Sequence, residues 1–238
     1  MSALRIGVII PTLNEAQELN ATLDAVLAER PDDVIVVDGG STDGTQNMAA
    51  ARVRCLPSLP GRARQLNAGA RELTTEVLLF LHADCRLGSG SLDAIRGSLA
   101  DSRVVGGGFH KRFRSQHPLL RRGGRARTHL WHQFGYVLGD QAQFIRQACF
   151  ERLAGFREDV LAEDMDLSWR MGLEGNCTLL EPELSLSARR LETHGVLATW
   201  ARWWSVVLSQ GVQAAWDGPR RGALSSAPRE SRDSSGTG

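Results

Sequence analysis

The chain has 238 residues, of which 42% are hydrophobic and 23% charged, a composition typical of a globular protein with a single core. The formal net charge of +1 argues against a nucleic-acid binder that works through its overall charge. The four cysteines include no C-x-x-C pair, which excludes a standard zinc site and favours a reducing compartment.

Three short apolar runs in the first third of the chain predict buried strands: residues 5–10, 34–37 and 77–81. Between them, apolar residues at helical spacing predict helices, the first one beginning at a capping box formed by Thr12 and Glu15. Strands that alternate with helices predict an α/β fold, with a mostly parallel central sheet flanked by helices.

Each predicted strand is followed by polar residues, which form clusters at positions 12–15, 38–44 and 82–84. Ligands of open parallel sheets bind beyond the carboxyl ends of the strands. We therefore expect the three clusters to share one crevice, although they are far apart in the sequence.

The second half of the chain differs in character. Residues 111–127 hold seven Lys and Arg residues and no acidic residue, which is consistent either with a site for an anionic acceptor or phospholipid surface or with a solvated loop. Residues 139–156 are expected to contain a helix that ends at Gly155, and a second helix is expected over residues 163–174.

The C-terminal part is predicted to end in a tail. Residues 196–216 form an apolar, Trp-rich helical stretch, suited to burial against the sheet or a partner subunit, with a membrane interface as the alternative. Ser, Gly, Pro and Arg dominate residues 218–238, which predicts disorder. Residues 1–217 are thus expected to form one domain. Residues 1–105 are its ligand-binding half, and residues 106–217 are its acceptor-side half.

Five segments, in this order, resemble glycosyltransferase family 2, whose members transfer sugars with inversion on the GT-A fold. They are PTLNE at 11–15, VVDGGSTDGT at 36–45, GRARQLNAG at 61–69, FLHAD at 80–84 and ED at 163–164. The chain looks most like a compact subgroup of this family that is described as radical-SAM or selenium-domain associated.

The resemblance implies a binding site for a nucleotide sugar. Pro11, Thr12, Glu15 and Asp38 match the residues that hold the base and ribose, and Arg62 matches a contact to the diphosphate. A cation at that place is physically sensible, because the leaving group is a nucleoside diphosphate.

The resemblance also implies a divalent cation, Mg²⁺ or Mn²⁺, bound at the family's D-x-D motif. That motif is His82-Ala83-Asp84 here, and Asp84 matches the essential second aspartate. His82 departs from the pattern, so its contact is open: ribose, metal or packing. Arg190 and His194 follow at the place where relatives have a loop that binds diphosphate or metal.

Asp164 matches the general base of the family, at the start of a predicted helix. An inverting transfer needs a carboxylate that takes the proton of the acceptor hydroxyl during attack on the anomeric carbon. The implied activity is a metal-dependent transfer of one sugar from a UDP- or GDP-sugar to an unidentified acceptor.

Two other functions were weighed against this activity. A nucleotidyltransferase that forms sugar nucleotides would carry a Gly-rich basic loop after the first strand, where PTLNE stands. A silent binding protein of the same fold is disfavoured by the presence of Asp38, Asp84 and Asp164 together.

The expected location is cytoplasmic, because the short N-terminal apolar run reaches Pro11 with no small-residue cleavage pattern and suits a first strand better than a signal peptide. Contact with the inner face of the membrane is the alternative, through the basic stretch at 111–127. A lipid-linked or anionic acceptor and a homodimer are the expected partners, and nucleic acid is not.

Overall fold

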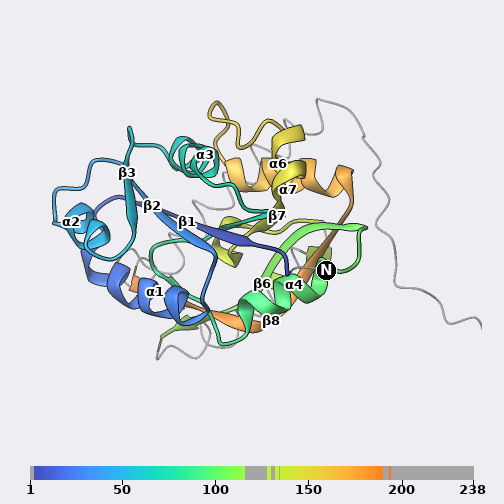
Figure 1. Ribbon diagram of the computed structural model, residues 1–238, viewed down its shortest axis with the longest axis horizontal. Helices are drawn as coiled ribbons and strands as arrows, with labels where there is room; N and C mark the ends of the chain where they lie inside the picture. Colours follow the sequence, from blue (N-terminus) through green and yellow to red (C-terminus); the bar gives the residue numbers. More distant parts are fainter. Residues whose placement is uncertain (1–2, 116–127, 130–131, 134, 190–192, 194–238) are drawn as a thin grey trace, which may run out of the picture.

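A computed structural model describes residues 3–115, 128–129, 132–133, 135–189 and 193. In this part of the chain, eight strands form one sheet in the order β3-β2-β1-β4-β7-β6-β8-β5 (Figure 1). The strands are β1 (Ile6–Thr12), β2 (Asp33–Asp38), β3 (Arg54–Pro57), β4 (Val77–Phe80), β5 (Cys85–Arg86), β6 (Val104–Arg114), β7 (Phe144–Arg146) and β8 (Asn176–Ser187).

The first four strands are parallel, as expected. β1 lies between β2 and β4, and β3 pairs with the outer edge of β2. Alternate side chains of β1 enter two separate cores: Ile6, Val8 and Ile10 pack on one face of the sheet and Ile9 on the other. Burial on both faces explains why these strands appear in the sequence as continuous apolar runs.

The other half of the sheet adds antiparallel pairs to the mostly parallel arrangement that was expected. β7 is antiparallel to both β4 and β6, and β5 is antiparallel to β8, whereas β6 and β8 run parallel. β7 was not predicted, because three residues are too short for a periodic pattern. The sheet is therefore mixed.

β6 contains a run of three glycines that has a packing cause. A Cβ added to Gly107 would lie 2.1 Å from the carbonyl oxygen of Thr178, and one added to Gly106 would lie 2.4 Å from that of Phe144. The neighbouring strands approach β6 too closely for any larger residue. The strand continues to Arg114, so the prediction of a basic loop from Lys111 onward is wrong for the first four residues.

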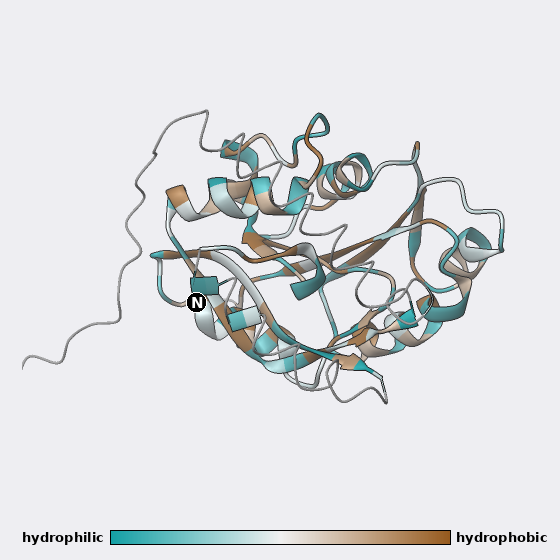
Figure 2. Ribbon diagram, turned by 180° about the vertical axis from the view of Figure 1, so that it is seen from behind, coloured by the Kyte–Doolittle hydropathy of each residue, from teal (hydrophilic) through white to brown (hydrophobic). Residues whose placement is uncertain are grey.

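Helices cover both faces of the sheet, so that the molecule has three layers with the sheet in the middle (Figure 1). On one face lie α1 (Ala16–Ala28), α2 (Thr45–Ala50) and α4 (Ser91–Ser98). On the other lie α3 (Arg62–Glu72), α6 (Gln147–Arg152) and α7 (Glu163–Glu174). Figure 2 shows the apolar strands between helices whose outer faces are hydrophilic.

Two local predictions have different outcomes. The capping box was wrong: Thr12 is the last residue of β1, and Glu15 precedes α1 without a side-chain cap. The helix expected over 163–174 was right at both ends. The predicted helix and tail at 196–238 and most of the basic stretch lie outside the described residues. No helix among the described residues is long and apolar enough to cross a membrane.

Candidate active site

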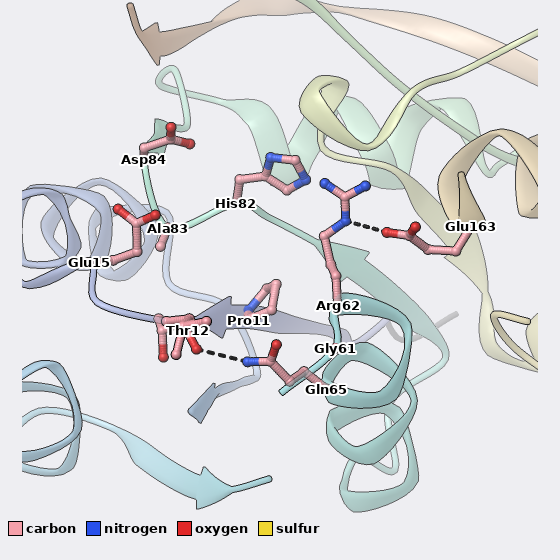
Figure 3. Close-up of a pocket in the computed structure, with 11 residues that line it drawn as sticks. Pro11, Thr12, Glu15, Gly61, Arg62, Gln65, His82, Ala83, Asp84 and Glu163 are labelled. Atoms are coloured by element: carbon pink, nitrogen blue, oxygen red, sulfur yellow. Dashed lines mark hydrogen bonds and ion pairs between the residues drawn. The ribbon is translucent and has the colours of Figure 1, made fainter. Parts of the chain in front are cut away.

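A cavity of about 380 Å³ opens beyond the carboxyl ends of β1 and β4, as the strand-end rule predicts. Figure 3 shows side chains from β1, α3, the segment after β4 and α7 turned towards it. Its lining consists of Pro11, Thr12, Leu13, Glu15, Gly61, Arg62, Gln65, His82, Ala83, Asp84 and Glu163.

Asp38 ends β2 behind this lining and orders the loop that follows. Its Oδ1 accepts the backbone N–H groups of Gly40 (3.0 Å) and Ser41 (2.8 Å), and its Oδ2 accepts the hydroxyls of Thr12 (3.0 Å) and Ser41 (2.6 Å). Burial opposes ionisation of Asp38, but the bonds from Ser41, Thr12 and Gly40 outweigh it and hold the pKa below its usual value.

Gln65 ties β1 to β2 beneath the cavity. Its Nε2 donates to the carbonyl oxygen of Thr12 (2.8 Å; Figure 3) and to that of Val37 (2.7 Å). Both bonds are buried, so the floor of the cavity is fixed by a side chain from α3.

Arg62, the first residue of α3, faces an acidic pair at the start of α7. Its Nε donates to the carboxylate of Glu163, and its Nη2 lies 3.9 Å from Oδ1 of Asp164. Burial lowers the pKa of Arg62, but Asp164 and Glu163 raise it by a larger combined amount. The side chain of Arg62 is 41% exposed and lines the cavity, so it is open to a ligand there.

Asp164 is held by backbone groups. Its Oδ2 accepts the N–H of Gly139 (2.8 Å) and its Oδ1 accepts the N–H of Met165 (3.0 Å). The side-chain amide of Gln143 donates to the backbone oxygens of Asp164 (2.9 Å) and Val137 (2.5 Å), which joins α7 to the turn before β7.

That turn, η1 (Gly139–Gln141), is fixed from β6. The ammonium of Lys111, only 1% exposed, pairs with Asp140, whose side chain is 33% exposed. A buried ammonium requires such a partner. The turn therefore brings the Gly139 N–H to Asp164 with little freedom.

The segment after β4 carries donors that suit a divalent cation. One ligand atom each of His82, Asp84 and Cys85 lie within 4.8 Å of one another. Burial lowers the pKa of His82, and Arg62 lowers it further, against the opposing effect of Asp84, Asp140 and Asp164. A carboxylate oxygen beside an imidazole nitrogen fits a cation such as Mn²⁺.

Comparison with known proteins decides the family. The model of the family described as Glycosyl transferase family 2 matches residues 7–163. The chain belongs to this family. No curated protein sequence matches it.

Among solved structures, the mannosyltransferase PcManGT from Pyrobaculum calidifontis, in complex with GDP-Man and Mn²⁺, is similar with a TM-score of 0.59 and 22% identity over 78% of this chain and 57% of its own. S. aureus TarS 1-349 is similar at a TM-score of 0.59 and 17% identity, over 78% and 61%. Its complex with UDP-GlcNAc gives 16% identity over 77% and 58%. The chain thus spans about three-fifths of these neighbours, and the GT-A fold is confirmed.

The structure brings most of the predicted residues of this family 2 chain together. Pro11, Thr12, Glu15, Arg62, His82, Ala83 and Asp84 line the cavity. Asp164 lies next to the cavity, near the guanidinium of Arg62, and Asp38 lies behind Thr12, whose hydroxyl it accepts. Arg190 and His194 lie outside the described residues, so their roles stay predictions.

Several residues of the site were missed from the sequence. Arg189 pairs with Glu15 across the cavity rim (2.9 Å) and also donates to Gln17 (2.9 Å). Gly139 and Asp140 have the Gly-Asp sequence of a tight turn, which is the only local indication of their place. Lys111 and Gln143 carry no signal, because their roles arise from long-range contacts.

Proposed function

We propose that this chain transfers a sugar from a UDP- or GDP-sugar to an acceptor hydroxyl, with inversion and with the help of a divalent cation. The observation that carries the proposal is the convergence of Arg62, Asp84 and Glu163 on one cavity at the strand ends, with Oδ1 of Asp164 3.9 Å from Nη2 of Arg62. The nucleotide sugars in the solved structures of similar fold support it.

The donor is proposed to lie along the β1 side of the cavity. Thr12 and Glu15 contact the nucleoside there, and Pro11 and Ala83 provide apolar walls. All four acceptor positions of the Asp38 carboxylate are used in this structure. Asp38 therefore contacts a base only if one of these bonds is exchanged.

Arg62 and Asp84 are proposed to hold the diphosphate. When a cation is bound at Asp84, it neutralises charge on the departing diphosphate. Arg62 pairs with Glu163 in this structure and is 41% exposed, so its guanidinium can turn to phosphate oxygens.

Asp164 is proposed as the general base. Among the described residues, each of its carboxylate oxygens accepts one backbone N–H, which leaves a second lone pair on each oxygen for the acceptor. It takes the proton of the acceptor hydroxyl while that oxygen attacks the anomeric carbon, and the bond from this carbon to the diphosphate oxygen breaks. The nucleoside diphosphate leaves, and the glycoside carries inverted configuration.

The acceptor side rests on the sequence alone. We propose an anionic or lipid-linked acceptor, a cytoplasmic location with contact to the inner face of the membrane, and membership of the radical-SAM-associated subgroup. The nature of the acceptor is tested by incubating cell extract with the enzyme and a radiolabelled donor and identifying the labelled product.

The first test uses water as acceptor, since slow donor hydrolysis needs the same site. Calorimetry should detect binding of UDP or GDP with Mn²⁺ or Mg²⁺, and Asp84→Ala should weaken it at least about tenfold. Asp164→Asn should lower hydrolysis about 100-fold or more and leave the donor Kd within about threefold.

Asp93→Asn is the matched control. Asp93 is 86% exposed on α4, which lies on the face of the sheet opposite to α3 and α7. It should change neither binding nor hydrolysis. The proposal fails if no nucleotide binds with either cation, and the assignment of the base fails if Asp164→Asn keeps full hydrolysis.

A further inference from the structure

We propose that His82 is a direct ligand of the cation and makes the site select Mn²⁺ over Mg²⁺. The inference rests on the proposed function for the place of the cation and goes beyond it in naming the ligand that sets metal preference. It starts from the departure of this chain from an all-carboxylate motif.

His82 and Asp84 lie on one short turn and face the same space. A ring nitrogen of His82, a carboxylate oxygen of Asp84 and the sulfur of Cys85 lie within 4.8 Å of one another. Figure 3 shows the imidazole between Asp84 and the guanidinium of Arg62. A cation at this place would lie between Asp84 and the position proposed for the diphosphate.

The backbone that carries both side chains is fixed. The carbonyl oxygen of Ala83 accepts the hydroxyl of Thr22 (2.6 Å). The carbonyl oxygen of Asp84 accepts the N–H of Ser187 (3.1 Å) and Nη2 of Arg114 (3.1 Å). Because three other elements hold this turn, the two candidate ligands are positioned before a cation arrives.

The chemistry of the two donors distinguishes Mn²⁺ from Mg²⁺. Mg²⁺ prefers an octahedron of oxygen ligands and keeps much of its water. Imidazole nitrogen binds first-row transition cations better than it binds Mg²⁺, and Mn²⁺, which oxygen donors also suit, accepts both ligand types. A neutral imidazole in place of a carboxylate also removes one negative charge, which weakens the Coulomb attraction on which a hard cation depends.

Cys85 serves as the internal comparison. Its thiol donates to Oδ1 of Asp84 over 3.7 Å, and the residue is 1% exposed. The hydrogen on sulfur is therefore directed at the carboxylate, and the nitrogen of His82 remains as the donor that separates the two cations.

The test measures metal binding and not turnover. Electron paramagnetic resonance follows free Mn²⁺ during titration of the protein with UDP or GDP present, and Mg²⁺ is then titrated as competitor. We expect a Kd for Mn²⁺ at least about tenfold lower than that for Mg²⁺, and His82→Asp should reduce this ratio about tenfold. Pulsed resonance should show nitrogen coupled to bound Mn²⁺ in the wild type and not in His82→Asp.

Two more variants separate the explanations. His82→Asn keeps a neutral polar side chain, and it should lose the nitrogen coupling and weaken Mn²⁺ binding about tenfold or more. Cys85→Ser should keep the ratio within about twofold. Thermal melting of each variant establishes that it folds.

The inference is overturned if His82→Asp keeps the ratio and the nitrogen coupling is absent from the wild type. It is also overturned if Cys85→Ser abolishes the preference, because sulfur is then the selecting ligand. Equal binding of both cations defeats only this inference. Binding of neither cation, with either nucleotide, defeats the proposed function.

Discussion

Gly139 occupies a position where even a methyl group would press on the proposed base. An added Cβ would lie 3.0 Å from Oδ2 of Asp164 and 3.2 Å from Nε2 of His82. Gly139→Ala should therefore displace the carboxylate by a few tenths of an ångström and lower donor hydrolysis about tenfold. The nucleotide Kd should change less than about threefold, as calorimetry and initial rates will measure.

Gly172 offers a control on the same helix as Asp164. An added Cβ there meets nothing within 4 Å, so Gly172→Ala should leave hydrolysis unchanged and stabilise α7 by about 1 kcal/mol through helix propensity. If the two variants lose the same activity, the effect belongs to α7 as a whole and not to contact with Asp164.

The site residues divide by how far apart in sequence their partners lie. The place of Asp84 was predictable, because the carboxyl ends of parallel strands meet at one edge of a sheet, whereas Arg62 was indicated only by the resemblance to the family. Gln65, Gly139 and Arg189 were not, since each acts through a partner between 25 and 174 positions away. No local pattern encodes such contacts.

Among the strands, β1, β2 and β4 were predicted from the sequence, whereas β3 and β5 to β8 were not. β1, β2 and β4 are buried on both faces, so their residues are apolar in continuous runs that can be recognised in the sequence. β6 carries glycines for close strand approach and a buried lysine. Both residue types indicate a loop when tertiary contacts are unknown.

The ion pair between β6 and η1 predicts which of two substitutions destabilises the fold more. Asp140→Asn leaves the ammonium of Lys111, 1% exposed, without the Asp140 carboxylate, and should cost about 3 kcal/mol of unfolding free energy. Lys111→Met removes the buried charge and leaves a carboxylate that is 33% exposed and can hydrate, so it should cost only about 1 kcal/mol.

Chemical denaturation of both variants measures the order. A larger loss for Lys111→Met would mean that the carboxylate, and not the ammonium, carries the desolvation penalty. Arg103→Met is a control, because its ion pair with Asp101 is exposed, and it should change stability by less than about 1 kcal/mol.

At the scale of the molecule, the cavity is bounded by segments that lie far apart in the chain. Glu15 precedes α1, Arg62 begins α3, Asp84 follows β4 and Glu163 begins α7. A ligand in this cavity would contact the parallel half of the sheet and both helical layers. Binding should therefore stabilise the whole fold and not one loop.

Thermal melting tests this coupling. A nucleotide at about 100 times its Kd adds about 2.7 kcal/mol to the folded state, which corresponds to a rise in Tm of about 5–10 °C for a chain of this size. UDP or GDP with Mn²⁺ should give this rise as one cooperative transition. Since Asp84 is the proposed cation ligand, Asp84→Ala should reduce the rise to that of the nucleotide with EDTA, whereas Asp93→Asn should keep it. An equal rise for wild type with and without EDTA would separate nucleotide binding from the cation and remove Asp84 from the site.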